Sequence, residues 1–250
     1  MTMHPTLRRA LTERRALKII SGLTNFDADR VANVVRAADR GGATFVDIAA
    51  DPVLVKLAKT LTDLPVCVSA VEPCKFVAAV QAGADLIEIG NFDAFYARGI
   101  RFEAPQVLQL TRETRQLLPE IALSVTVPHI LAMNEQQELA EELVEAGADI
   151  IQTEGGASSQ PAHAGTLGLI EKAAPTLAAA SEISRAVSVP VLCASGISCV
   201  TAPMAIAAGA SGVGVGAAIN RLDSEVAMIA GVRSLVEALS TVSRDRIYAY

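Results

Sequence analysis

A repeated dipeptide constrains the fold of this chain more than any other feature. Gly-Ala precedes a short apolar segment four times, at residues 42–43, 83–84, 147–148 and 209–210. Each pair follows a helix-like run, where glycine readily takes the position just past the helix end. Three further apolar segments begin after Pro65, Pro119 and Pro190, and LKIISG at 17–22 completes the set. The sequence therefore predicts eight strands, and the even-numbered ones share one entry signal.

Helical patterns fill the intervals between these predicted strands. They cover about 27–40, 51–61, 73–82, 104–118, 134–146, 176–187, 199–208 and 223–240. Strict alternation of strands and helices is typical of a parallel sheet, and eight units in 250 residues favour closure into a (β/α)8 barrel over a doubly wound sheet. No linker is evident, so we expect one α/β domain over residues 1–250. The Arg-rich start predicts a short amphipathic helix with Leu7, Leu11 and Ala10 turned inward.

Composition argues against several classes of protein. The net charge of −6 gives nucleic acid no general attraction, and no apolar run is long enough to span a bilayer. The four cysteines show no Cys-x-x-Cys and the three histidines are scattered, so we expect reduced thiols and no metal site. The amino-terminal stretch lacks the apolar core of a secretory signal. We therefore expect a cytoplasmic protein with neither a nucleic-acid nor a membrane partner.

Two glycine-containing loops near the end of the chain predict a phosphate site. The seventh strand breaks into Ser195, Gly196 and Ile197, and the eighth breaks at Gly216 and Ala217. Glycine lets backbone N–H groups approach a ligand closely, and the loops after strands 7 and 8 of such barrels commonly hold phosphate. The alternative is that these glycines only serve tight turns between strand and helix.

Alternation along the even strands places charged side chains inside the predicted barrel. Asp47, Glu88 and Gln152 fall in one layer, and Glu154 falls in the layer above. Lys18 in LKIISG is the obvious cation for this interior, as a Schiff-base nucleophile, an acid or base, or an ion-pair partner. We predict a catalytic set of Lys18, Asp47, Glu88 and Glu154. The alternative is a structural ion pair at the barrel floor, with Lys18 reaching out of the bottom.

Smaller polar residues at strand ends are candidate substrate ligands. Ser69 and Thr126 lie on odd strands, and His129 follows the fifth strand, where it could carry a proton near neutral pH. Asn25 and Asn91 stand in two Asn-Phe-Asp words after strands 1 and 4. With Gln152, these residues form the predicted substrate-binding set. Packing and solvation are the alternatives for the hydroxyls and for His129, whereas Cys193 is expected to be a small core residue on the same face as Ser195.

Two predicted loops exceed the usual length of a strand-to-helix connection. One spans 90–104 and is rich in aromatic residues, and the other spans 154–175 and is rich in Gly, Ser and Ala. Both leave the carboxyl ends of strands, where barrel active sites lie, so residues 155–170 are predicted to form a mobile lid. A subunit interface in a homo-oligomer, or simple packing, is the alternative for the aromatic loop.

Four segments together carry a family resemblance. They read SGLTNFD after the first strand, EIGNFDAFY after the fourth, VTVPHILAMNEQQELA at the fifth and ADIIQTEGG at the sixth. Across nearly the whole chain they resemble the DUF561-like "hypothetical chloroplast reading frame" barrels of cyanobacteria and plastids. The family has no established activity to carry over. The resemblance implies a TIM barrel and, for plastid relatives, a stromal location.

A more distant resemblance concerns a possible cofactor. Residues 149–220 resemble the last quarter of flavin-dependent barrels such as nitronate monooxygenases, in which a Glu-Gly-Gly-type segment precedes two phosphate loops. That resemblance implies FMN. The histidine expected after the glycine pair is absent here, and Ser158 and Ser159 stand nearby instead.

These observations lead to one function and two alternatives. We expect a barrel that binds a small phosphorylated metabolite and acts as a lyase, isomerase or synthase. An FMN-binding oxidoreductase is the first alternative. The second is a barrel without catalysis that serves as a metabolite sensor or an assembly partner.

Overall fold

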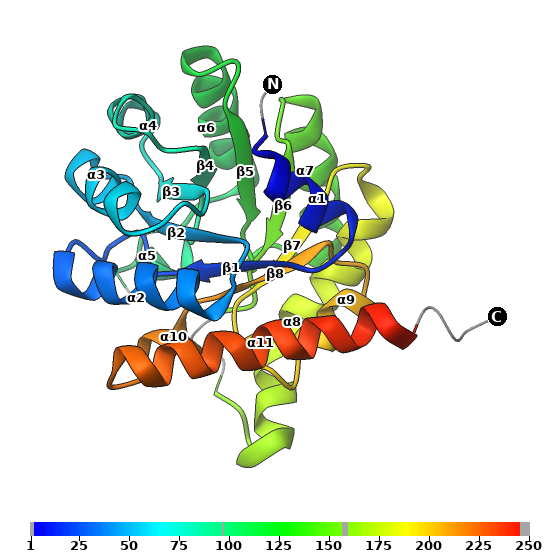
Figure 1. Cartoon of the computed structure of the whole chain (residues 1–250). Helices are drawn as coiled ribbons and strands as arrows, with labels where there is room; N and C mark the ends of the chain where they lie inside the picture. Colours follow the sequence, from blue (N-terminus) through cyan, green and yellow to red (C-terminus); the bar gives the residue numbers. More distant parts are fainter. Residues whose placement is uncertain (1–2, 97, 157–159, 246–250) are drawn as a thin grey trace.

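The computed structural model describes residues 3–96, 98–156 and 160–245, and in it eight parallel strands close into a barrel. Each strand pairs with the next in chain order, and β8 pairs with β1 (Figure 1). The strands are β1 Ala16–Ile20, β2 Phe45–Ala49, β3 Val66–Ala70, β4 Leu86–Ile89, β5 Ala122–Val127, β6 Ile150–Thr153, β7 Val191–Ala194 and β8 Gly212–Val215. The predicted α/β barrel and its eight strands are confirmed.

Helices follow every strand and surround the barrel (Figure 1). They are α1 Pro5–Thr12, α2 Ala28–Gly41, α3 Pro52–Leu61, α4 Pro73–Gln81, α5 Asp93–Tyr96, α6 Ala104–Leu117, α7 Met133–Glu145, α8 Gly165–Ala186, α9 Ala202–Ala207, α10 Ala217–Asn220 and α11 Glu225–Asp245. Local chemistry sets several of their starts. The Asp27 and Asp51 side chains each accept two backbone N–H groups at the beginning of α2 and α3, which supplies acceptors that the helix itself lacks.

Strand alternation divides the apolar side chains into two cores. The outward-facing residues pack under the helices in one large cluster. The inward-facing residues at the strand starts, such as Phe45, Leu86 and Leu192, pack against Leu7 and Leu11 of α1. Helix α1 therefore plugs the amino-terminal end of the barrel, as its amphipathic pattern predicts. Among the described residues, no helix combines the length and apolar character that a bilayer crossing requires.

The prediction of a long loop after β6 is partly wrong. Helix α8 begins at Gly165 and runs through Pro175, so the residues from 165 onward are helical rather than loop. Proline removes only one backbone donor, and tertiary packing holds the helix, since Ala173, Thr176 and Ala180 are fully buried against the barrel. The central part of the predicted lid, residues 157–159 with Ser158 and Ser159, lies outside the described residues.

The aromatic loop after β4 folds onto itself. Phe92 is fully buried, and its ring centroid lies 4.7 Å from that of Phe102, while Phe95 stacks edge-on to Phe102 at 5.6 Å. The short helix α5 carries Tyr96 toward His129, with 5.1 Å between the ring centroids. Packing therefore accounts for most of this loop, and it brings one tyrosine to the barrel mouth.

Candidate ligand-binding site at the barrel mouth

A cavity of about 420 Å³ opens at the carboxyl ends of the strands. Its wall comes from the loops after β1, β4, β6, β7 and β8 and from α8. Loops at this end carry the active sites of TIM barrels. The predicted phosphate residues Ser195, Gly196, Ile197, Gly216 and Ala217 all line the cavity, as do Asn91, Thr126, Gln152 and Glu154.

The loop after β7 is held in an unusual backbone conformation. Ser195 and Gly196 both have positive φ, 79° and 73°, and positive φ is uncommon for a residue with a side chain. A Cβ on Gly196 would lie 2.7 Å from the Lys172 carbonyl oxygen, so packing against α8 already requires glycine there. The Ser198 backbone N–H is not free to bind a ligand, because it donates to Thr201 Oγ1 at 2.9 Å.

Gly216 in the loop after β8 differs from Gly196. Its φ is −111°, which any residue adopts, and an added Cβ would make an ordinary contact of 3.5 Å with Ile20. Neither conformation nor crowding explains the glycine, and a longer side chain would enter the cavity. Helix α10 starts immediately afterwards, and the Ala217 and Ala218 N–H groups in its first turn have no acceptor within the helix. Asn220 anchors α10 by donating to the Ile20 carbonyl at 2.8 Å.

Side chains of both charges line the cavity. Lys172 of α8, whose carbonyl adjoins Gly196, and Arg221, at the end of α10, are cationic. Asp93 and Glu154, which follow β4 and β6, contribute carboxyl groups. The cavity thus offers positive charge to an anion as well as groups that can accept a proton.

Gln152 lies at the cavity floor. Its Nε2 donates to Glu88 Oε1 at 2.9 Å and to Thr126 Oγ1 at 3.1 Å. The residue is 3% exposed, and its Oε1 has no partner among the described residues.

Beneath Gln152 the predicted polar cluster is present. Lys18 Nζ lies 2.6 Å from Glu88 Oε2, and Ser124 Oγ donates to the same oxygen at 2.8 Å. Asp47 accepts a hydrogen bond from Ser69 Oγ at 2.6 Å. All five side chains are buried, so Lys18 does not reach out of the bottom. None of the five is among the described residues that line the cavity, so Lys18 and Ser69 are not placed to touch its contents.

Burial and mutual charge set the protonation of this cluster. Burial alone lowers the pKa of Lys18, but the carboxylates of Glu88 and Asp47 outweigh it, and the pKa rises above its ordinary value. Burial raises the pKa of Asp47 to about 7 and Glu88 adds to the rise, while Lys18 and the Ser69 hydroxyl oppose it. The cluster therefore holds an ammonium beside one carboxylate and a second carboxyl that keeps its proton to near neutral pH.

Glu154 forms a second polar cluster at the cavity wall. Its Oε1 accepts from the Asp93 N–H at 2.9 Å, and its Oε2 contacts Tyr96 Oη at 3.2 Å and His129 Nδ1 at 3.0 Å. His129 Nδ1 also lies 3.8 Å from Asp93 Oδ1. The hydrogen bond that His129 donates to Glu154 raises the pKa of His129 despite partial burial. This cluster could hold a metal ion. Among the described residues, one ligand atom each from Asp93, His129 and Glu154 lies within 4.8 Å of the others.

The remaining predicted residues separate into two sets. Asn91, with a positive φ of 65°, lines the cavity. Asn25 instead donates to Ser21 Oγ at 2.9 Å and accepts from the Asp27 N–H, and it is not among the described lining residues. Cys193 is a buried core residue, as predicted, but it does not share the inward face on which Ser195 was expected. It points outward against Thr176 of α8, and burial raises its pKa to about 11.

Sequence reasoning missed Lys172 and Asp93 as cavity residues. Lys172 fell in a segment expected to be loop, and Asp93 stands in an Asn-Phe-Asp word from which only Asn91 was predicted to bind a ligand. Helix α8 is only weakly amphipathic, so the local pattern carried little signal for the first. The second depends on the fold of the aromatic loop and had no local signal.

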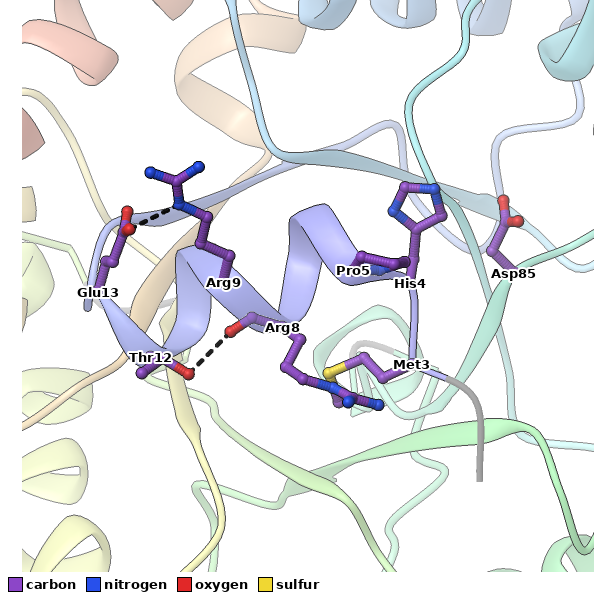
Figure 2. A pocket seen from close by; sticks show the side chains of 8 residues that line it. All are labelled: Met3, His4, Pro5, Arg8, Arg9, Thr12, Glu13 and Asp85. Carbon is purple, nitrogen blue, oxygen red and sulfur yellow. Dashed lines mark hydrogen bonds and ion pairs between the residues drawn. The ribbon is translucent and has the colours of Figure 1, made fainter.

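A larger hollow of about 660 Å³ lies at the opposite end of the molecule (Figure 2). It runs along α1 and is lined by Met3, His4, Pro5, Arg8, Arg9, Thr12, Glu13 and Asp85. Its polar groups largely serve α1 itself, since Arg9 pairs with Glu13 at 2.7 Å and Thr12 donates to the Arg8 carbonyl at 3.0 Å. It lies away from the carboxyl ends of the strands, so its size does not make it the candidate site.

Comparison with known proteins agrees with the barrel. The model of the family described as "Protein of unknown function (DUF561)" matches residues 3–245. The uncharacterized protein ycf23 of Cyanophora paradoxa is 42% identical over 240 residues, which are 96% of this chain and 97% of that protein. No activity is given in either name.

Two solved structures share the fold. One is (S)-3-O-geranylgeranylglyceryl phosphate synthase from Thermoplasma acidophilum in complex with sn-glycerol-1-phosphate, with a TM-score of 0.63 and 16% identity, covering 96% of this chain and 99% of that one. The other is thiamine phosphate pyrophosphorylase from Pyrococcus furiosus, with a TM-score of 0.61 and 20% identity, covering 93% and 98%.

Proposed function

This chain belongs to the DUF561 family of proteins of unknown function, and we propose that its barrel binds a small phosphorylated molecule at the mouth. The bound molecule undergoes a lyase, isomerase or synthase step there. The observation that carries the proposal is Gly216, which neither its backbone angle nor its neighbours require to be glycine. Space for a ligand between the loops after β7 and β8 is the remaining reason for it.

The phosphate is assigned to the part of the cavity formed by the loops after β7 and β8. The Ala217 and Ala218 N–H groups supply donors, and Lys172 and Arg221 supply positive charge. The two structural neighbours described above carry phosphate in their names, which supports this use of the fold.

The proton-transfer role is assigned to Glu154 with His129. Glu154 lines the cavity, and His129 Nδ1 hydrogen-bonds its carboxyl group. The imidazole can donate to the ionised carboxylate or accept from the protonated acid, so His129 stabilises Glu154 before and after it takes a proton. Lys18, Asp47 and Glu88 were predicted to be catalytic, and we now assign them to positioning, because Gln152 and Thr126 stand between them and the cavity.

The test is phosphate binding by Gly216→Asp, measured by calorimetry with inorganic phosphate. A carboxylate in the cavity should weaken binding by about 100-fold or more through charge repulsion alone. Leu117→Asp adds the same charge at an exposed position at the far end of α6 and should bind phosphate like the parent. Unchanged binding by Gly216→Asp would overturn the proposal.

The purified protein also separates the alternatives. Native mass spectrometry would detect a phosphorylated metabolite that co-purifies. Flavin absorbance would favour the oxidoreductase alternative. The sensor alternative would be favoured if the parent binds a phosphorylated metabolite tightly without turning it over. In that case Glu154→Gln should bind the metabolite equally tightly.

A further inference from the structure

The geometry points to Gln152 as a fixed hydrogen-bond acceptor that selects phosphate esters bearing a free hydroxyl group. This inference rests on the proposed function and specifies its ligand. It concerns one atom, the Gln152 Oε1 at the cavity floor.

The orientation of the Gln152 amide is fixed from below. Its Nε2 donates to the Glu88 carboxylate at 2.9 Å and to Thr126 Oγ1 at 3.1 Å. A flipped amide would place its carbonyl oxygen against that carboxylate, losing a charge-assisted hydrogen bond and creating repulsion. Glu88 is itself held by Lys18 Nζ at 2.6 Å and by Ser124 Oγ at 2.8 Å. The buried ion pair therefore decides which end of the amide meets the ligand.

The other end of the amide is left without a partner. Gln152 Oε1 is buried and makes no hydrogen bond to any described residue, while the side chain lines the cavity. Buried acceptors in native proteins are nearly always satisfied, so the missing donor belongs to the contents of the cavity.

An acceptor discriminates between ligands by what they donate. A hydroxyl group can donate to Gln152 Oε1, whereas a methyl group or an ether oxygen leaves it unpaired. Sites built around such a bond reject analogues that lack the donor, because a buried polar group then stays unsatisfied. The cavity therefore fits a hydroxylated phosphate ester better than an alkyl phosphate of the same length.

The experiment compares three probes by calorimetry: inorganic phosphate, n-propyl phosphate and glycerol phosphate. We expect the parent to bind glycerol phosphate at least tenfold more tightly than propyl phosphate. Gln152→Met keeps the length of the side chain without its acceptor and should abolish that preference. Glu88→Gln removes the carboxylate that fixes the orientation of the Gln152 amide. It should reduce the preference for glycerol phosphate without changing any cavity-lining residue.

Ser69→Ala is the matched control, because Ser69 belongs to the same buried cluster but contacts Asp47 rather than Gln152. It should keep the full preference. A parent that binds phosphate but shows no preference for the hydroxylated ester, or a Gln152→Met variant that retains the preference, would overturn this inference alone. Absence of phosphate binding by the parent would overturn the proposed function together with it. If Glu88→Gln fails to fold, Gln152→Met decides.

Discussion

Removing the buried Lys18 ammonium tests the barrel interior most directly. In the Lys18→Met variant a side chain of similar length replaces the ammonium that lies 2.6 Å from Glu88, where the two side chains are 0% and 2% exposed. Breaking such a pair leaves an uncompensated charge in the core, which typically costs about 3–5 kcal/mol. For a chain of this size, that corresponds to a loss of about 6–20 °C in melting temperature.

The pH dependence of this loss identifies its cause. Burial raises the pKa of Asp47 to about 7 in the parent, where Lys18 opposes the rise, so removing Lys18 should raise the pKa of Asp47 further. An acid whose folded-state pKa lies above its unfolded value stabilises the fold at low pH and loses that contribution as pH rises through the folded value. The deficit of Lys18→Met should therefore be larger at pH 8 than at pH 5.

Urea denaturation at both pH values, with matched variants, completes the measurement. Lys59→Met breaks the half-exposed pair with Asp85, at 2.9 Å, and should cost less than about 1 kcal/mol. Lys18→Met combined with Glu88→Gln removes a buried charge and should recover part of the loss. A Lys18→Met deficit below about 1 kcal/mol, or one independent of pH, would refute the buried ion pair.

Two further variants test the Asp47 proton and the glycine loops. Burial raises the pKa of Asp47 from 3.8 to about 7, so the parent loses stability as this carboxyl ionises, whereas the Asp47→Asn variant cannot ionise there. The stability of the variant relative to the parent should therefore grow between pH 4 and pH 8, by on the order of 3 kcal/mol. A constant difference in urea denaturation would contradict this. Gly196→Ala should lose about 1–3 kcal/mol, because the new Cβ meets the Lys172 carbonyl at 2.7 Å in a positive-φ backbone. Gly216→Ala, with neither problem, should change stability by less than about 1 kcal/mol, and equal losses in the two variants would argue against different roles for the two glycines.

The interior of the barrel was predictable from the sequence because strand alternation is a local property. Counting from the shared Gly-Ala entry turned Asp47, Glu88 and Gln152 toward the barrel interior, and the contact of Gln152 with Glu88 confirms the inward direction of these two. Lys18 was predicted to point inward by the same reasoning, and it does. Parallel register carries such an assignment around a closed sheet, since every strand is paired on both sides.

Helix α8 and the face of β7 depend on contacts that no local pattern records. The sequence predicted a helix only from residue 176, after Pro175. Thr176 hydrogen-bonds Thr153 Oγ1 at 2.6 Å and the Ala194 carbonyl at 2.5 Å, which fixes the longer helix on the barrel around the proline. The same contacts turn Cys193 outward and leave Ala194 inside. Tertiary packing thus overrode the local signals at the two elements that border the cavity.

The balance of charge inside the barrel explains why its polar layer can be stable. Lys18 offers one positive charge to two buried carboxyl groups, so one of them is left uncompensated when both are ionised. Glu88 takes the direct contact with Lys18, and Asp47 keeps its proton to near neutral pH while accepting a hydrogen bond from Ser69. The layer is then close to neutral, which reduces the cost of burying it. Because that neutral arrangement places a carboxylate under the Gln152 amide, the stability of the core and the orientation of the acceptor in the cavity depend on the same ion pair.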